Sequence, residues 1–257
     1  MRRSSDFIQS LERGLSVINS FSRERTSQTL SEVAQNTGLT RATARRVLLT
    51  LSDLGYVHQA SRAFSLTPKV LDLGYSYLSS LRVVEVAQQP MERLVEEVRE
   101  SSSMSVLDGK EIVYVARVPT TRIMTIALAL GSRLPAYPTS MGRVLLAALD
   151  DAELEEYITG TDLRRLTEHT ITDRDAFREA IGKVRAEGFS LVDQELEEGV
   201  RSIAAPIRNA RGEVIAAMNV SCHASRVTVD RMRDEFRPRL LAAADEINER
   251  VELLPGS

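Results

Sequence analysis

The sequence predicts an α+β protein of two domains, a small helical domain followed by a larger domain built on an antiparallel sheet. Apolar residues recur at helical spacing through residues 8–54, and a short β-like hairpin follows them. After residue 100, strand-like runs and hairpin turns mix with helices in no strict strand–helix repeat, which favours an α+β arrangement. Charge divides in the same way, because residues 1–75 carry a net charge of +4 and residues 76–257 a net charge of −7.

The composition narrows the class of protein. With 257 residues, 43% of them hydrophobic, the chain is long enough to form two domains with hydrophobic cores. Cys222 is the only cysteine, so no disulfide forms within the chain and a reducing cytoplasm is the simplest location. No window approaches the roughly 18 apolar residues of a membrane span, and no apolar signal core follows Arg2 and Arg3. We therefore expect neither a membrane segment nor a secretory signal.

Three helices are predicted in the first domain. The first has an apolar stripe formed by Ile8, Leu11, Leu15 and Ile18. Thr29 and Glu32 have the spacing of a capping box that begins the second helix, and Gly38 suits the left-handed residue that ends it. Thr40 caps a third helix only two residues later, so the two helices are joined by a short turn.

This helix pair has the features of a helix-turn-helix. Ala42 and Thr43 are small enough to let the third helix approach the major groove, and the arginines beside them reach phosphates or guanine edges. Two β-like runs at 56–59 and 64–67 then predict the hairpin wing of a winged helix. The predicted DNA-binding residues are Thr40, Arg41, Ala42, Thr43, Arg45, Arg46 and Arg62, the last at the wing tip. The alternative is a solvated basic face on an ordinary helical hairpin.

The remaining chain is expected to form a linker helix and the larger domain. We expect the winged helix-turn-helix over residues 1–68, the linker helix over 69–85 and the second domain over 86–257. Strands are predicted at 103–107, 111–118, 122–130, 189–193, 202–208 and 214–221. Helices are predicted at 86–98, 139–149, 150–158, 173–187 and 227–252.

Several longer motifs extend over both domains. They include Ser-Leu-Glu-Arg-Gly-Leu at 10–15, Gly-Ser-Arg-Leu-Pro at 131–135 and Thr-Ser-Met-Gly-Arg at 139–143. On these motifs the whole chain resembles the IclR family of bacterial transcriptional regulators. The runs 112–117 and 192–204 resemble its branch that controls protocatechuate, 4-hydroxybenzoate and β-ketoadipate catabolism. The resemblance implies a GAF-like effector-binding and oligomerisation domain, a dimer through the DNA-binding heads and a tetramer formed as a dimer of dimers.

The resemblance also implies an effector pocket. The matching positions are Ile123, Ser140, Met141, Val192, Val200, Ser202, Asn219 and Ser221. The residues themselves support part of this, because Ser140, Met141 and Gly142 open a helix whose free amides and dipole favour an anion. Gly142 is expected to leave the approach to those amides open. Relatives often have Cys at the position of Ser202 and Ala or Leu at that of Met141, so these two positions are expected to tune the ligand.

We therefore expect a regulator that binds double-stranded operator DNA and a small carboxylic acid, aromatic or dicarboxylic, with no cofactor. Within the same fold, the alternative is a short-chain carboxylate such as a 2-oxo acid. Without the resemblance, core and cap positions are the favoured interpretation of the pocket residues, because apolar alternation usually marks a core. Arg133 and Arg201 are candidate partners for the carboxylate, or else surface or inter-strand charges.

Two rival functions remain. A small-molecule-binding interaction module would lack DNA binding, and a hydrolase would use Cys222 with His223. Adjacent residues on a strand point to opposite faces, which opposes that pair, so no catalytic residue is expected.

The acidic cluster of Asp193, Glu195, Glu197 and Glu198 would suit a divalent metal. A solvated loop or salt-bridge face is favoured instead, and no metal site is expected.

Overall fold

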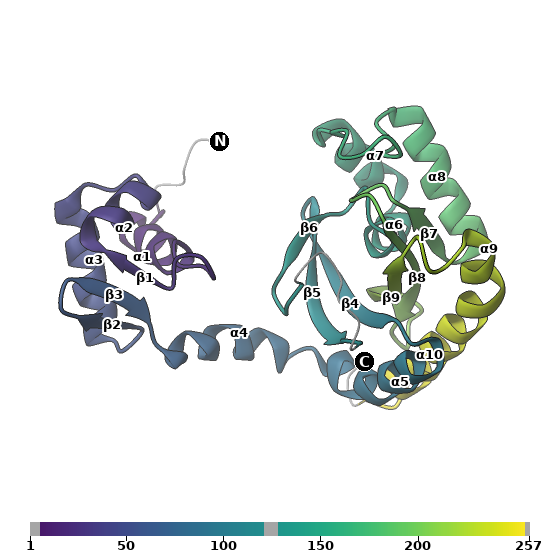
Figure 1. Cartoon of the computed structure of the whole chain (residues 1–257), viewed down its shortest axis with the longest axis horizontal. Helices are drawn as coiled ribbons and strands as arrows, with labels where there is room; N and C mark the ends of the chain where they lie inside the picture. Colours follow the sequence, from purple (N-terminus) through teal and green to yellow (C-terminus); the bar gives the residue numbers. More distant parts are fainter. Residues whose placement is uncertain (1–5, 121–127, 255–257) are drawn as a thin grey trace. The chain divides into compact units, whose positions relative to one another are not determined.

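The chain forms two compact units. The computed structural model describes residues 6–120 and 128–254, and the units divide at Ser80 and Leu81. Both combine helices with an antiparallel sheet, which confirms the predicted α+β fold class (Figure 1). The division falls inside the segment expected to be a linker helix, and each unit is described below on its own.

The first unit is a helical domain with a three-stranded sheet. Its elements are α1 (Gln9–Asn19), β1 (Ser27–Thr29), α2 (Leu30–Thr37), α3 (Arg41–Asp53), β2 (Val57–Ala60), β3 (Ala63–Leu66), the 3-10 helix η1 (Pro68–Val70) and α4 (Leu71–Leu78). The strands are antiparallel in the order β1-β3-β2, so β2 and β3 form the predicted wing. The short β1 strand, which was not predicted, adds an edge to this hairpin.

The predicted caps set the geometry of α2 and α3. Glu32 Oε2 accepts a hydrogen bond of 2.7 Å from the Thr29 amide, and the Thr29 hydroxyl accepts from the Glu32 amide, which completes the capping box. Gly38 ends α2 with a φ of 68°, and the Thr40 hydroxyl then caps α3 at the Thr43 amide. The short turn between α2 and α3 therefore forms where the sequence predicted it.

Two features of the first unit differ from expectation. The predicted stripe of α1 faces outward, since Ile8, Leu11 and Leu15 are 63%, 60% and 47% exposed while Val17 is buried. The segment after the wing is also not one helix, because α4 ends before Leu81, whose ψ of 75° is not helical. Helix α4 is followed by Ser79 and Ser80, and serine is a weak helix former because its hydroxyl competes for backbone hydrogen bonds.

The second unit is built on a six-stranded antiparallel sheet in the order β6-β5-β4-β9-β8-β7. Its strands are β4 (Ser101–Asp108), β5 (Glu111–Val118), β6 (Arg133–Pro135), β7 (Ser190–Asp193), β8 (Val200–Arg208) and β9 (Val214–His223). Its helices are α5 (Arg82–Val98), α6 (Ser140–Ala147), α7 (Asp151–Gly160), α8 (Arg174–Glu187), α9 (Val229–Arg231), the π-helical segment η2 (Met232–Phe236) and α10 (Arg237–Glu252).

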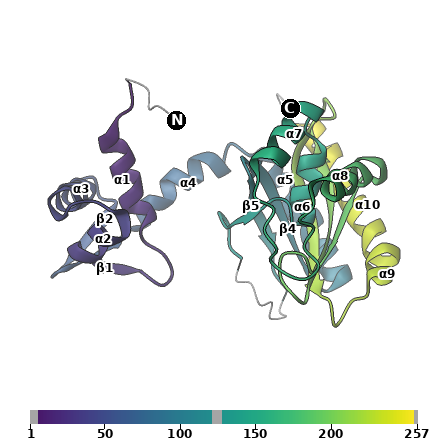
Figure 2. The same ribbon diagram turned by 90° about the horizontal axis from the view of Figure 1, so that it is seen from above.

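Helices cover both faces of this sheet (Figures 1 and 2). On one face α6 contacts β4, β8 and β9, and α8 packs behind α6. On the other face α5 and α10 contact each other and the strands. The core on the α6 side includes Met141, Leu145 and Ile181, which are almost completely buried. The amino end of α6 is therefore held against the centre of the sheet.

Three elements of the second unit differ from the prediction or lie outside the described residues. The predicted strand at 122–130 lies mostly outside the described residues, as does Ile123. Strand β6 was not among the predicted strands, and its Leu134 pairs with Ile112. The predicted helix at 227–252 contains the π-helical segment η2, so it is not a single regular α-helix.

Gly142 provides a stability test of the α6 packing. A Cβ atom at this position would overlap the backbone of Ala136, so Gly142→Ala is expected to destabilise the unit by about 1–3 kcal/mol. Gly182 in α8 is the matched control, because no atom lies within 4 Å of a Cβ placed there. Gly182→Ala is expected to raise stability by about 0.5–1 kcal/mol. Urea unfolding measures both, and equal effects of the two variants would contradict the packing argument.

Candidate DNA-binding surface and effector cavity

The predicted DNA-binding residues gather at the start of α3 and the tip of the wing. Helix α3 buries Ala44, Leu48 and Leu51, and this fixes which of its sides faces solvent. Exposed on that side or at the wing tip are Thr40, Arg41, Ala42, Arg45, Arg46 and Arg62. Thr43 is half-buried, with its hydroxyl 2.9 Å from that of Thr40. Thr43 therefore contributes to the helix cap as well as to the surface.

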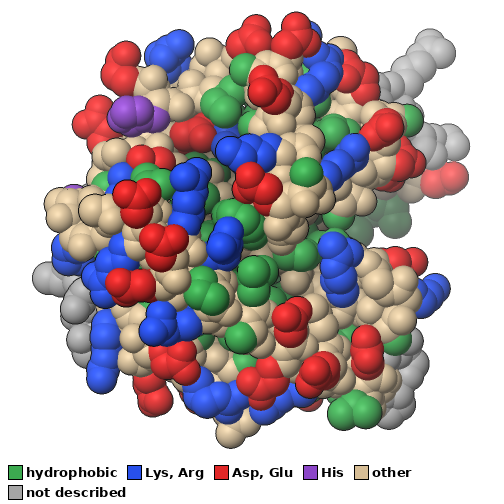
Figure 3. All heavy atoms as spheres, turned by 90° about the vertical axis from the view of Figure 1, so that its right-hand side faces the viewer, with side chains coloured by type: hydrophobic (Ala, Val, Ile, Leu, Met, Phe, Trp, Pro, Cys, Tyr) green, Lys and Arg blue, Asp and Glu red, His purple; other side chains and the backbone are tan. Residues whose placement is uncertain are grey.

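The arginines on this surface carry uncompensated charge. In residues 6–120 and 128–254, no acidic group pairs with Arg41, Arg45, Arg46 or Arg62. In the second unit, by contrast, the face that carries α8 and α9 mixes acidic and basic side chains (Figure 3), with ion pairs such as Arg231–Glu235 at 2.9 Å. Exposed arginines that have no acidic partner favour binding of a polyanion such as DNA.

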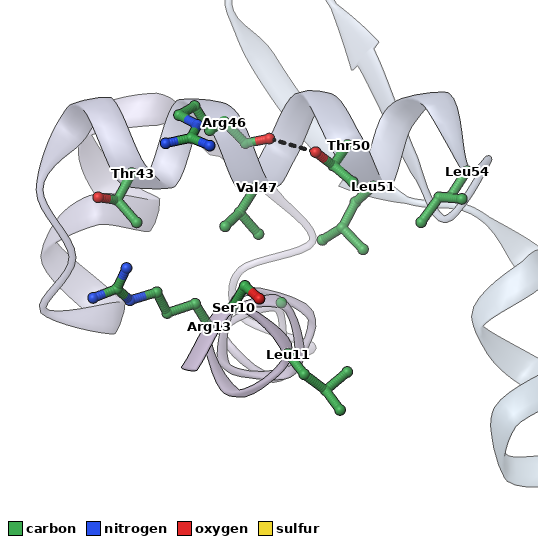
Figure 4. A pocket seen from close by; sticks show the side chains of 10 residues that line it. Ser10, Leu11, Arg13, Thr43, Arg46, Val47, Thr50, Leu51 and Leu54 are labelled. Carbon is green, nitrogen blue, oxygen red and sulfur yellow. Dashed lines mark hydrogen bonds between the residues drawn. The ribbon is translucent and has the colours of Figure 1, made fainter. Parts of the chain in front are cut away.

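A groove between α1 and α3 was not predicted. It has a volume of about 470 Å³ and is lined by Ser10, Leu11, Arg13, Gly14, Thr43, Arg46, Val47, Thr50, Leu51 and Leu54. Figure 4 shows Arg13 and Arg46 at the end where α3 begins, and Leu51 and Leu54 towards the other end. The apolar stripe of α1 was the sequence feature that could have indicated this groove. Amphipathicity alone, however, does not show whether such a stripe is buried or exposed.

The predicted effector residues meet at a cavity between α6 and the sheet. Seven of the nine line it, namely Ser140, Met141, Val192, Val200, Ser202, Asn219 and Ser221. Ile123 lies outside the described residues, and Gly142 is not part of the lining. Tyr114, Leu128, Leu134, Pro138, Thr139 and Leu196 also line the cavity and were not predicted. Tyr114 and Leu196 lie within the runs 112–117 and 192–204, whose resemblance to the aromatic-acid branch could have indicated these two residues.

The amino end of α6 presents hydrogen-bond donors to this cavity. Ser140 and Met141 occupy the first helical turn, where amides lack partners within the helix. Among the described residues no acceptor meets their amides, and the buried Ser140 hydroxyl also has no partner. Unmet buried donors are costly, so this position suits an anionic group that accepts several hydrogen bonds.

Gly142 has a different role from the one expected. Its amide donates to the Thr139 hydroxyl at 3.0 Å, so it is already satisfied by the helix cap. A Cβ atom at Gly142 would overlap the Ala136 backbone rather than close the cavity. Glycine is therefore required because the helix packs tightly against the preceding segment, and not because a ligand approaches there.

The opposite wall consists of small polar groups with a defined hydrogen-bond direction. The Ser103 amide donates to Asn219 Oδ1 at 3.1 Å, and Asn219 Nδ2 donates to Ser221 Oγ at 2.9 Å. Ser202 lies directly across from Ser221 in the sheet. Because Ser221 Oγ already accepts one bond, its own proton is available to a ligand. Burial raises the pKa of Tyr114 to about 12, so its hydroxyl stays neutral.

The cavity has little free volume. Its free volume is about 30 Å³, whereas drug-sized ligands occupy pockets of roughly 300–1,000 Å³. Its lining includes the long apolar side chains of Met141, Leu128, Leu134 and Leu196. A ring-sized ligand therefore enters only if some of these side chains move.

Neither arginine considered as a carboxylate partner is free. Arg133 pairs with Glu111 at 2.7 Å and with Asp108 at 2.6 Å on the surface. Arg201 pairs with Asp193 at 2.8 Å across β7 and β8. Both are thus the inter-strand charges of the alternative interpretation, and no charged side chain is among the described residues that line the cavity.

The acidic cluster and Cys222 also have other partners. Asp193 is paired with Arg201, and Glu195 with Arg143, so the four carboxylates do not converge on one point. Cys222 is fully buried, and burial raises the pKa of its thiol to about 12, which keeps it protonated. His223 bonds instead to Ser225 at 2.7 Å. Cys222 and His223 therefore do not form the nucleophile pair that the rival hydrolase function would need.

Comparison with known proteins identifies both units. The IclR helix-turn-helix domain matches residues 10–61, and the IclR C-terminal domain of bacterial transcriptional regulators matches residues 75–249. In the part of the chain that the structure describes, no helix has the length and apolarity of a membrane span.

The chain is also similar to individual proteins over almost its full length. It is 45% identical to the Pca regulon regulatory protein of Pseudomonas putida, over 94% of this chain and 84% of the relative. It is 38% identical to the p-hydroxybenzoate hydroxylase transcriptional activator of Acinetobacter baylyi, over 97% and 94%. The crystal structure of an IclR homolog with 4-hydroxybenzoate from Microbacterium hydrocarbonoxydans matches with a TM-score of 0.86 and 26% identity, over 95% and 100%. The chain therefore belongs to the IclR family of bacterial transcriptional regulators, with a DNA-binding helix-turn-helix unit and a ligand-responsive C-terminal unit.

Proposed function

We propose that this regulator controls genes of aromatic-acid catabolism and responds to an aromatic or dicarboxylic acid bound in the cavity of the second unit. The observation that carries the proposal is the set of donors without acceptors at Ser140 and Met141, inside a cavity with apolar and hydroxyl walls. Two similar proteins support the class of ligand. One is named for activating p-hydroxybenzoate hydroxylase transcription, and the other was crystallised with 4-hydroxybenzoate.

In this proposal the carboxylate lies at the amino end of α6. It accepts hydrogen bonds from the Ser140 and Met141 amides and from the Ser140 hydroxyl, which together offset its desolvation. The ring lies between Val192, Val200 and the leucines of the lining, with Ile123 as a further proposed contact. Ser202, Asn219 and Ser221 meet polar substituents at its far end.

The first unit binds double-stranded operator DNA, which places the protein's action in the cytoplasm. Arg41, Arg45 and Arg46 reach the major groove or the phosphates beside it, and Ala42 allows close approach. Thr40 and Thr43 fix the start of the helix, and Arg62 contacts the backbone or minor groove from the wing tip. The exposed and unpaired guanidinium groups support this assignment.

The protein acts as a homodimer through its DNA-binding units, and two dimers associate into a tetramer. Support for the dimer comes from the apolar surface of α1 and the end of α3, where Ile8, Leu11, Leu15 and Leu54 are 63%, 60%, 47% and 53% exposed. A contiguous apolar surface of this kind is typical of an interface between subunits. Effector binding alters DNA affinity only if it favours one arrangement of the paired units over another.

Arg45→Ala is expected to weaken specific operator binding by about 1–3 kcal/mol, because a bidentate contact with one base pair is lost. Electrophoretic mobility shift at two salt concentrations measures the effect. Arg233→Ala, which removes an exposed arginine of the second unit, is the matched control and should bind as the wild type does. If both variants keep wild-type affinity and footprint, Arg45 does not contact DNA.

Leu11→Glu is expected to dissociate the dimer, since it introduces a charge into the centre of the apolar surface on α1. Gln9→Glu adds the same charge at a neighbouring exposed position of the helix, roughly opposite Leu11, and should leave the dimer intact. Analytical ultracentrifugation of the full chain distinguishes the two. A Leu11→Glu variant that sediments as the wild type would place the interface elsewhere.

Met141→Trp is expected to take up the room that a ligand needs in this cavity and to abolish the effector response, while the separate first unit retains operator binding. A thermal-shift screen over aromatic and short-chain carboxylic acids first identifies the best ligand, since a ligand specific for the folded state raises the melting temperature. Titration of the variant with that acid then shows whether the acid binds in this cavity. Wild-type affinity in the variant would show that the acid binds outside this cavity. A cooperative thermal unfolding transition of the second unit reports that the variant is folded.

A further inference from the structure

A buried ion pair joins two walls of the effector cavity. Arg143 lies on α6, directly after the cavity residues at the start of that helix, and Glu195 directly precedes the cavity residue Leu196. Their side chains are only 5% and 8% exposed, and Arg143 Nη2 lies 2.6 Å from Glu195 Oε2. Neither residue lines the cavity itself. The pair therefore links the α6 wall to the Leu196 wall without occupying the ligand space.

Arg143 is fixed at several points. Its Nε donates to the Tyr137 carbonyl at 3.1 Å, and its guanidinium lies 5.7 Å from the centre of the Phe177 ring. Tyr137 belongs to the segment that leads into α6, so the side chain folds back over the start of its own helix. This geometry holds the guanidinium rigidly relative to Ser140 and Met141.

Glu195 is fixed equally firmly. The carboxylate oxygen that meets Arg143 also accepts from the Ile171 amide at 3.1 Å, and the Glu195 carbonyl accepts from the Thr170 hydroxyl at 2.7 Å. On the other side of Leu196, the chain closes into a tight loop, since the Gln194 amide donates to the Val200 carbonyl at 2.8 Å. The backbone at Leu196 is therefore held in place while these bonds remain.

From this arrangement we propose that Arg143 and Glu195 are positioning residues that set the largest acid the cavity accepts. The inference rests on the proposed function of the cavity. The free volume of about 30 Å³ means that any ring-sized ligand displaces part of the lining. With the pair intact, the distance between the start of α6 and Leu196 is fixed, so room comes from rotation of flexible side chains. When the pair is lost, the Leu196 wall moves outward and larger acids fit.

The double variant Arg143→Met/Glu195→Gln tests this directly. Replacing both charges avoids leaving one buried ion unpaired, and Gln keeps an acceptor for the Ile171 amide. Arg185→Met is the matched control, because Arg185 donates to the Ala147 and Leu149 carbonyls at the opposite end of α6. Leu196→Ala is a second test, since it enlarges the cavity with the ion pair in place.

Isothermal titration of each full-length variant with benzoate, 4-hydroxybenzoate, 4-ethoxybenzoate and 2-naphthoate measures the size limit. In a rigid pocket one additional methylene group changes binding by about tenfold or more, so the wild type should discriminate steeply against the largest acids. The ratio of the dissociation constants for 2-naphthoate and benzoate should fall about tenfold in the double variant and in Leu196→Ala. Arg185→Met should keep the wild-type ratio.

The outcomes separate this inference from the function on which it rests. If the wild type binds acids and the double variant keeps the wild-type ratio, with only a lower melting temperature, the pair is merely structural and the inference is wrong. An equal change of ratio in Arg185→Met would also overturn it, because general loosening of α6 would then suffice. If neither the wild type nor Leu196→Ala binds any acid of the series, the proposed function fails together with the inference.

Discussion

In the proposed account, ligand binding by the second unit depends on burial of a helix amino end that lacks acceptors for its donors. The first turn of α6 lies against the centre of the sheet, where Ser140 and Met141 line a cavity. The Ser140 hydroxyl has no partner, and no acceptor among the described residues meets the two amides. Such donors are costly without an acceptor and strongly attract a carboxylate. A neutral cavity can thus favour an anion without a lysine or arginine in its described lining, because the helix itself supplies the positive potential.

The surrounding structure holds this helix end in place. Gly142 permits contact with the Ala136 backbone, the Thr139 hydroxyl caps the third amide, and Arg143 returns over the helix start to reach Glu195. In the first unit, by contrast, charge and apolar surface are left exposed, which suits a unit whose partners are other macromolecules. In the proposed function the two units therefore bind their partners by opposite means, the second unit in a buried cavity and the first unit on an exposed surface.

Much of this arrangement was predictable because its signals are local. The capping box at Thr29, the cap at Thr40 and the strand runs that carry Val192, Ser202 and Asn219 depend on neighbours in sequence, and the structure has these elements where they were expected. The outward direction of the α1 stripe was not predictable, since periodicity defines a face but not what covers it. The Arg143–Glu195 contact and the packing role of Gly142 depend on chain segments brought together only by the fold.

A crystal structure of the protein with a bound aromatic acid tests the central claim most directly. The account predicts a carboxylate oxygen about 2.7–3.2 Å from the amide nitrogen of Ser140 or Met141, with the ring between α6 and the sheet. A carboxylate bound elsewhere, whether reversed towards Ser221 or in the groove beside Arg13 and Arg46, would contradict it.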